Sequence, residues 1–202
     1  MKRTKEEADL TRQTLMKAAL VVFSKHGYAA TRLEDIAQEA NVTRGAIYHH
    51  FGGKAELFNA LVSEFSTGAV DVTTQLMASS QSYVDALRQM LLTTWDYLES
   101  NADYRAVMEL TMFKTGVDEE LAEGMRLKKE GTRLMMEQLA QFIAEGMAKG
   151  ELRADLDPLE TARTFIAAQN GLALLWLFDP EAFSLRASAH AAAEIFVRGV
   201  IP

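Results

Sequence analysis

The stretch LEDIAQEANVTRGAIYHHF, residues 33–51, decides the fold of the N-terminal part of the chain. Its apolar residues recur at the spacing of two short helices, about 33–40 and 44–51, and can form one small core. The chain must turn sharply between these helices, and Asn41 is a residue type that tolerates a positive φ. Thr43 then follows as a residue that caps a helix by accepting a backbone N–H. The stretch therefore predicts a helix-turn-helix motif, whose second helix enters the major groove of DNA.

The outer face of that second helix carries side chains suited to DNA. Arg44, at the helix start, can donate two hydrogen bonds to a guanine. The small residues Gly45 and Ala46 keep the helix slim, so that its backbone can approach the base edges. Side chains suited to phosphate contacts are those of Tyr48, His49 and Lys54. The N–H groups that open the helix from residue 54 add an anion site.

The adjacent residues His49 and His50 also raise the alternative of a metal site. Neighbouring residues on a helix point about 100° apart, however, and no carboxylate lies four residues from both histidines. No metal is therefore expected, and His50 is expected to pack against the first helix.

Composition limits the other possibilities. The chain has 202 residues, 49% of them apolar, which is enough for one or two domains with a real core. It has no cysteine, which excludes disulfides and thiolate chemistry. Residues 1–54 hold nine Lys and Arg against six Asp and Glu, whereas the rest holds 12 against 22. This charge asymmetry indicates two parts with different functions, of which the basic N-terminal part is suited to binding nucleic acid.

The N-terminus has no apolar leader, and no run of about 18 apolar residues occurs, so no membrane partner and a cytoplasmic location are expected. Helical periodicity extends along the whole chain and predicts an all-α fold of about nine helices. The start signal Asp157, Pro158 and Glu160 is the clearest of these boundaries, with Asp157 as the cap. The expected helices cover about 8–26, 33–40, 44–51, 54–78, 83–99, 103–114, 118–149, 158–178 and 184–199.

Residues 31–58, TRLEDIAQEANVTRGAIYHHFGGKAELF, resemble the DNA-binding signature of the TetR family of transcriptional repressors. The preceding TRQTLMKAALVVFSKHGYAAT resembles the first helix of that family. Both KRTKEEADLTRQ at the start and NGLALLWLFDPEAFSL at 170–185 resemble its AcrR-like branch, which represses multidrug efflux pumps. The resemblance covers both ends of the chain, and the middle is compatible with it but divergent.

The resemblance implies a set of DNA-binding positions. It implies phosphate contacts at two residues that begin helices, Thr31 and Thr43. It implies base reading or close approach to the bases at Arg44, Gly45 and Ala46. It implies contacts with the DNA backbone at Tyr48, His49 and Lys54. The chain departs from the family pattern in three places: Asn41 replaces a usual Gly, His49 stands where Trp or Tyr is common, and Gly52-Gly53 replaces a more polar pair.

Residues 55–202 contain no catalytic constellation, so neither an enzyme nor a cofactor is expected. They are rich in methionine and aromatic residues, which can adapt around varied apolar ligands but also fill ordinary cores. The expected pocket has Gln169 or Asn170 as its polar group, because buried amides need partners. Bonds to another helix, or exposure at an interface, remain alternatives for these amides. The apolar wall of the pocket is expected from Trp95, Met108, Met112, Phe113 and Trp176.

The last two helices are unusually apolar, and such faces usually meet another chain. Paired across a two-fold axis, they would form a four-helix dimer interface. The residues expected at this interface are Phe165, Leu185, Ala189, Ala193, Phe196 and Val197.

These patterns lead to one interpretation. Residues 1–54 form a DNA-binding domain, and residues 55–202 form a ligand-binding and dimerisation domain. Together they make a homodimeric repressor that a small apolar or amphipathic ligand releases from a palindromic double-stranded operator. An adaptor or activator that acts through protein contacts, and an α-helical enzyme, are the alternatives. The presence of Arg44 argues against the first, and the lack of a polar catalytic cluster argues against the second.

Overall fold

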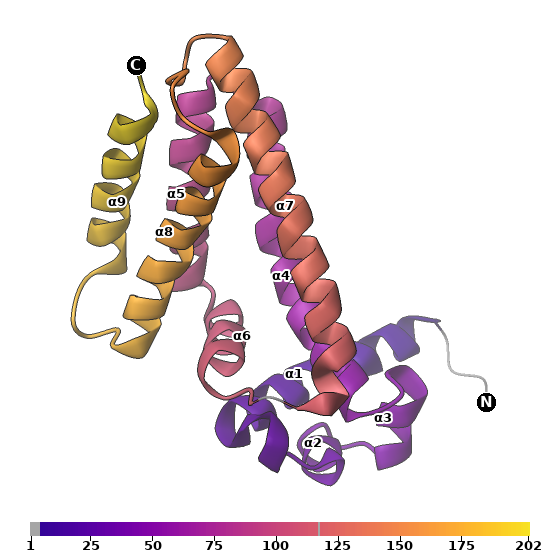
Figure 1. Cartoon of the computed structure of the whole chain (residues 1–202). Coiled ribbons are helices and arrows are strands. Elements are labelled where there is room, and N and C mark those ends of the chain that lie inside the picture. The colour runs from indigo at the N-terminus through magenta and orange to yellow at the C-terminus, as the bar shows by residue number, and fades with distance from the viewer. Residues whose placement is uncertain (1–4, 117) are drawn as a thin grey trace. The chain divides into compact units, whose positions relative to one another are not determined.

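The computed structural model describes residues 5–116 and 118–202, with the side chains of 66–70 left out. These residues form nine α-helices and one short 3-10 helix, and no strand, as Figure 1 shows. The all-α prediction is confirmed. In chain order the elements are α1 Lys5–Ala30, α2 Leu33–Glu39, α3 Arg44–His50, α4 Lys54–Ser79, α5 Tyr83–Ser100, α6 Ala102–Phe113, η1 Glu119–Leu121, α7 Ala122–Ala148, α8 Pro158–Phe178 and α9 Leu185–Val200.

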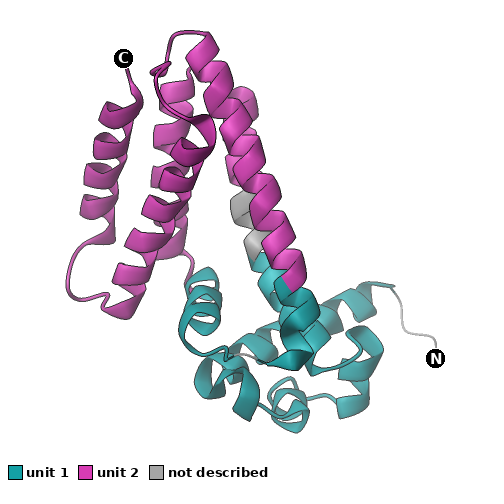
Figure 2. Cartoon of the chain, in the orientation of Figure 1, with its two compact units in different colours: residues 1–67, 103–125 teal, residues 68–102, 126–202 magenta. Residues whose placement is uncertain are grey.

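The chain divides into two compact units (Figure 2). The first unit comprises residues 1–67 and 103–125, and the second comprises 68–102 and 126–202. The first unit therefore contains α1 to α3, the start of α4, α6 from its second residue onward, η1 and the start of α7. The predicted boundary after residue 54 separates a DNA-binding domain from a ligand-binding domain. This functional division stays a prediction.

The helix-turn-helix has the predicted turn. Asn41 has a φ of 53° and is the one non-glycine residue with positive φ among those described. Asparagine tolerates this left-handed conformation better than most residues do. The N–H of Val42 donates to the carbonyl of Ala37 at 2.9 Å, which closes the turn. Ile36 and Ile47 are fully buried on the two sides of the turn, as the sequence predicted.

Three aromatic rings lie at the centre of the first unit. Phe23 and Phe58 meet edge to face with ring centroids 5.3 Å apart, and Tyr28 lies 5.0 Å from Phe58. Such pairs add to the stability that burial alone supplies. Val107 of α6 and Leu121 of η1 are buried in the same core. Helices α6 and η1 thus contribute to the core of the first unit.

The predicted N-terminal cap is formed in α8 but not in α3. Asp157 accepts a 2.8 Å hydrogen bond from the N–H of Glu160, and Pro158 opens α8, as expected. Thr43 occupies the cap position of α3, but its hydroxyl makes no capping bond. The N–H of Ala46 donates instead to the Thr43 carbonyl at 2.9 Å, so the donor that a cap would use is already taken.

Two helices differ from their expected bounds. The expected helix 118–149 begins with the 3-10 turn η1, because Asp118 accepts from the N–H of Glu120 at 3.0 Å and caps this turn first. The first helix extends to Ala30 but has non-helical geometry at Gly27, where φ is 73°. Gly27 is therefore the predicted stop, after which one more helical turn follows.

The second unit packs α9 and α8 against α5. The guanidinium of Arg88 binds Glu194 at 2.9 Å, and Arg186 lies 3.7 Å from Asp96, so ion pairs join α5 to α9 at both positions. Trp95 of α5 is 1% exposed and donates through its indole N–H to the Gln169 carbonyl at 3.1 Å.

The six residues expected at the dimer interface are buried within the protomer, and the position of the interface stays a prediction. All six lie inside the chain, and none is more than 9% exposed in the isolated protomer: Phe165, Leu185, Ala189, Ala193, Phe196 and Val197. Phe165 and Phe196 meet each other edge to face at 5.3 Å. Their helical spacing turns them toward the core of the second unit. The apolar side chains that do face outward on α8 and α9 are Leu159, Leu174, Leu175, Phe178 and Ile195.

Candidate DNA-binding interface

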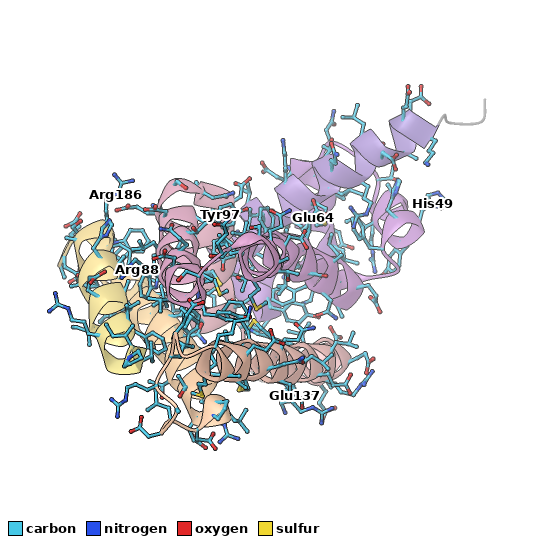
Figure 3. All side chains as sticks on the ribbon, turned by 90° about the horizontal axis from the view of Figure 1, so that it is seen from above. His49, Glu64, Arg88, Tyr97, Glu137 and Arg186 are labelled. Carbon is cyan, nitrogen blue, oxygen red and sulfur yellow. The ribbon has the colours of Figure 1, made fainter. Side chains whose placement is uncertain are left out.

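The exposed face of α3 is built from residues one helical turn apart. Arg44 and Tyr48 lie four residues apart, and the guanidinium donates to the Tyr48 hydroxyl at 2.7 Å while lying 5.3 Å from the ring centre. His49 is exposed beside them, and Figure 3 shows it on the outer side of this helix. Ile47 is fully buried and fixes this orientation. The structure therefore brings together the predicted contact residues of α3 on one accessible face.

Arg44 also makes an ion pair with the preceding helix. Its guanidinium donates to Oε1 of Glu34, in the first turn of α2, at 2.6 Å. The pKa of Glu34 is lowered, first by a backbone hydrogen bond at the helix start and then by the charge of Arg44. The pKa of Arg44 is raised, first by its hydrogen bond with Tyr48 and then by the charge of Glu34. Both groups are therefore charged over the whole neutral range.

Gly45 and Ala46 follow at the start of α3. A Cβ added at Gly45 would make only ordinary contact, 3.7 Å from Oγ1 of Thr43. The fold of the protein itself thus has room for a side chain at this position. Ala46 is half-buried and packs against the core of the first unit.

The two threonines lie in different surroundings. Thr31 is 3% exposed, and its hydroxyl donates to the Gly27 carbonyl at 2.7 Å. Its side chain is used within the protein and is not available to a phosphate in this conformation. Thr43 is exposed at the start of α3, and its hydroxyl has no capping role.

Lys54 is turned toward the protein. Its ammonium donates to the carbonyls of Tyr28 at 3.1 Å and Thr31 at 3.2 Å, and it lies 4.3 Å from the centre of the Tyr28 ring. The predicted phosphate contact would have to compete with these bonds. The structure thus gives Lys54 a role in joining the start of α4 to the end of α1.

The predicted anion site lies at the start of α4. Gly52 has a φ of 100°, which favours glycine, and Gly53 follows it. Oε2 of Glu56 would lie 2.8 Å from a Cβ at Gly53. A carboxylate in the first turn of α4 thus lies close to Gly53, and the anion site stays a prediction.

The sequence did not single out Glu34 or Tyr28. Tyr28 follows the break at Gly27, and its hydroxyl donates to Oε2 of Glu120 at 2.8 Å. Burial, followed by the bond and the charge of Glu120, raises the pKa of Tyr28. A tyrosine after a glycine that ends a helix is a weak signal, and its partner lies 92 residues away. For Glu34 the signal was the opposite charge ten residues before Arg44, across the turn.

The predicted ligand-binding residues are divided between the two units. Trp95, Gln169, Asn170 and Trp176 belong to the second unit, whereas the three residues of α6 and its end, Met108, Met112 and Phe113, belong to the first. Asn170 is exposed on α8 in the protomer, which agrees with the alternative of exposure at an interface. Gln169 is half-buried, and it is its backbone carbonyl that meets Trp95. The pocket stays a prediction.

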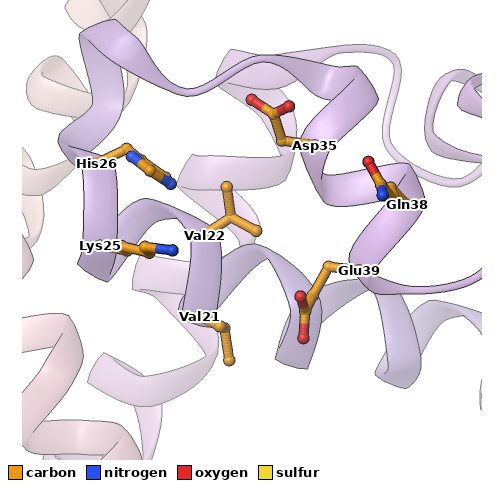
Figure 4. Close-up of a pocket in the computed structure, with 7 residues that line it drawn as sticks. All are labelled: Val21, Val22, Lys25, His26, Asp35, Gln38 and Glu39. Atoms are coloured by element: carbon orange, nitrogen blue, oxygen red, sulfur yellow. The ribbon is translucent and has the colours of Figure 1, made fainter.

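Two hollows occur elsewhere. One, of about 440 Å³, lies between α1 and α2 (Figure 4). It is lined by Lys25 and His26 on α1 and by the carboxylates of Asp35 and Glu39 on α2. The other, of about 540 Å³, lies beside the chain end and includes Arg153 and Asp155, which form an ion pair. In the described part of the chain no group of three or more side chains is arranged to hold a metal ion.

The three-helix motif, with its exposed cationic α3 and its helical second unit, defines a helix-turn-helix DNA-binding regulator. Comparison with known families agrees. Residues 15–61 match the family of bacterial regulatory proteins named tetR, and residues 83–201 match the C-terminal region of MAATS-type transcriptional repressors. The chain belongs to the TetR family of transcriptional regulators, with a C-terminal region of the MAATS type. It is accordingly a regulator and not an enzyme.

Individual relatives extend over nearly the whole chain. The transcriptional regulator TtgR of Pseudomonas putida is 33% identical over 190 residues, covering 92% of this chain and 89% of TtgR. The structure of NalD, the secondary repressor of the MexAB-OprM multidrug efflux pump in Pseudomonas aeruginosa, has a TM-score of 0.87. It is 29% identical, with 98% of both chains covered.

SmeT, a repressor of the Stenotrophomonas maltophilia efflux pump SmeDEF, has been solved in complex with triclosan. That complex has a TM-score of 0.81 and 25% identity, covering 96% of this chain and 92% of SmeT. As for the membrane, none of the described helices combines the length and the apolar character that a span requires.

Proposed function

We propose that this regulator represses transcription by binding a palindromic double-stranded operator as a homodimer, in the cytoplasm. A small apolar or amphipathic effector then releases it. The observation that carries the DNA part is the accessible face of α3, where Arg44 stands at the helix start beside Tyr48 and His49. Residues 1–54 form the DNA-binding domain in this proposal, and residues 55–202 bind the effector and the partner.

Base reading falls to Arg44, because a guanidinium can donate two hydrogen bonds to a guanine in the major groove. Gly45 supports this arrangement. The fold has room for a side chain there, so a requirement for glycine would come from close approach to DNA. Tyr48, His49 and Thr43 are placed to contact phosphates, which fix register without reading sequence.

Dimerisation uses the outward faces of α8 and α9. Phe178 is 80% exposed and Ile195 is 75% exposed, and Leu174 and Leu175 lie along the same end of α8. Large exposed apolar side chains in a group are typical of protein interfaces. A second copy of the chain is the occupant proposed here, because an isologous two-fold contact also supplies the symmetry that a palindromic operator requires.

The effector part is supported by the relatives. SmeT was solved with triclosan, an apolar ring compound, and NalD and SmeT are repressors of multidrug efflux pumps. We extend this to the present chain as control of an efflux pump. The proposed binding region includes Trp95 and Trp176, with Gln169, whose backbone carbonyl accepts from Trp95, as its polar residue.

The DNA proposal is tested by selection from a random pool of duplexes at low salt. The proposal requires that the wild-type protein recover an inverted repeat with two half-sites about one helical turn apart. Recovery of sequences without a common motif would contradict the proposal.

The effector proposal is tested with triclosan and related ring compounds. An effector at 100 times its dissociation constant should add about 2.7 kcal/mol to the free energy of unfolding. It should also lower the affinity for the selected duplex, because coupling between two sites is reciprocal. Stabilisation without any change in DNA affinity would show a ligand that does not act as an effector.

A further inference from the structure

In the free protein, the guanidinium of Arg44 donates hydrogen bonds to two neighbouring side chains. One terminal nitrogen of its guanidinium donates to Glu34 at 2.6 Å, and the other donates to the Tyr48 hydroxyl at 2.7 Å. Glu34 comes from α2, and Tyr48 comes from α3, so both helices of the motif orient one cation. A guanidinium carries more N–H donors than these two bonds use, so Arg44 can still donate to a base.

The ionised form of Glu34 is favoured by its own helix as well as by Arg44. The carboxylate lies in the first turn of α2, where a backbone hydrogen bond and the helix dipole favour a negative charge. In the free protein it lies 2.6 Å from the guanidinium of Arg44. Since the pair has no net charge, the attraction of Arg44 for phosphates is largely cancelled.

Phosphates and guanine respond differently to this cancellation. Binding to any DNA sequence depends mainly on how many phosphates the cations of the protein neutralise. Reading of guanine depends on directed hydrogen bonds to O6 and N7, which need an oriented fork of donors. A partner that cancels charge while fixing orientation therefore lowers non-specific binding more than it lowers specific binding.

We propose that Glu34 is a specificity-determining residue that positions Arg44 for a base and keeps it from binding phosphates at random. The inference rests on the proposed function, in which Arg44 reads a base. It adds a residue from α2 that reaches no base itself but sets the ratio of specific to non-specific affinity.

Glu34→Gln removes the negative charge but keeps the size of the side chain and an acceptor oxygen for Arg44. The matched control is Asp35→Asn, which removes the same charge from the next residue of α2. Asp35 is exposed and lines the hollow between α1 and α2, next to Lys25 and His26 and not to Arg44. Both substitutions lie on the surface, so thermal melts should match those of the wild type.

The measurement is affinity for two duplexes as a function of salt, by fluorescence anisotropy. One duplex is the inverted repeat selected with the wild-type protein, and the other has the same composition in scrambled order. Glu34→Gln should raise affinity for the scrambled duplex about two- to fivefold, the range of an exposed ion pair. The dependence of log affinity on log salt should steepen by up to about 0.9 for that duplex, as one more phosphate is neutralised. The ratio of specific to non-specific affinity should fall.

A double substitution identifies Arg44 as the cause. In an Arg44→Ala background, Glu34→Gln should change scrambled-duplex affinity no more than Asp35→Asn does. If Glu34→Gln and Asp35→Asn have equal effects in the Arg44 protein, Glu34 acts only through net charge and the inference is overturned. If the wild type selects no duplex at all, the proposed function itself fails. The two failures are therefore distinguishable.

Discussion

The hydroxyl of Tyr28 donates a 2.8 Å hydrogen bond to Oε2 of Glu120, which lies 92 residues further along the chain. The same region holds a second link, because the ammonium of Lys114 donates to the Ser24 carbonyl at 2.7 Å. The N–H of Tyr28 in turn faces the Lys114 carbonyl at 3.4 Å. The end of α1 is thus held by the segment that joins α6 to α7.

Tyr28→Phe should lower the free energy of unfolding by about 1–2 kcal/mol, because a buried side chain loses a hydrogen bond to a charged group. The wild type should also show a pH dependence that the variant lacks. The pKa of Tyr28 is raised in the folded state above its ordinary value of 10.0, so its contribution is fully present below pH 10 and is lost as the pH rises further.

Urea unfolding of both proteins at pH 8 and above pH 10 tests this prediction. The difference in stability between wild type and Tyr28→Phe should shrink at the higher pH. Glu120→Gln is the control, since it keeps an acceptor but removes the charge that opposes ionisation of Tyr28. A difference that stays constant with pH would contradict the assignment.

Lys54→Met should lower the free energy of unfolding by about 2 kcal/mol, because the carbonyls of Tyr28 and Thr31 lose a charged donor. The salt dependence of DNA binding should stay close to that of the wild type. Lys17→Met, at an exposed position of α1, controls for net charge. If the dependence of log affinity on log salt became flatter by about 0.9 in Lys54→Met but not in Lys17→Met, Lys54 would be a phosphate contact after all.

Arg44→Ala should weaken binding to the selected duplex about 5- to 100-fold and leave binding to a scrambled duplex nearly unchanged. Arg44→Lys should not restore the loss, since an ammonium lacks the planar fork of a guanidinium. Repeating the duplex selection with Arg44→Ala should show relaxed preference at one position of each half-site. Equal weakening on both duplexes would mean that Arg44 contacts phosphates only.

Adjacent residues of α9 provide a matched pair for the dimer. Ile195→Glu should dissociate the dimer and change protomer stability by less than about 0.5 kcal/mol, because Ile195 is 75% exposed. Phe196→Glu should instead destabilise the protomer by about 4 kcal/mol or more, because it buries an unpaired charge against Phe165. Sedimentation equilibrium and thermal melts distinguish the two effects. A dimeric Ile195→Glu protein would place the interface elsewhere.

Local signals predicted most of the fold. The spacing of apolar residues predicted the helices. Positive φ angles occur as expected at Asn41 and Gly27, and the predicted helix cap is formed by Asp157. These features depend on neighbours a few residues away, which a sequence displays directly. The helix-turn-helix and its exposed Arg44 belong to the same kind of evidence.

Features that depend on distant partners could not be read in this way. Lys54 finds its carbonyl acceptors 26 and 23 residues earlier, so its inward orientation has no local signal. In α9, alanines occur on both faces, and Ile195 and Phe196 are neighbours with similar hydrophobicity. Periodicity alone therefore could not decide which of the two packs against Phe165 and which faces outward.

The position of the two tryptophans gives the protein a built-in spectroscopic probe. Trp95 and Trp176, the two tryptophans of the sequence, both belong to the second unit, and Trp95 is fixed there by its bond to the Gln169 carbonyl. Intrinsic tryptophan emission thus reports on the second unit alone, whereas far-ultraviolet circular dichroism reports helices of both. Unfolding curves recorded by the two signals on one unlabelled sample separate the melting of the DNA-binding motif from that of the rest of the chain.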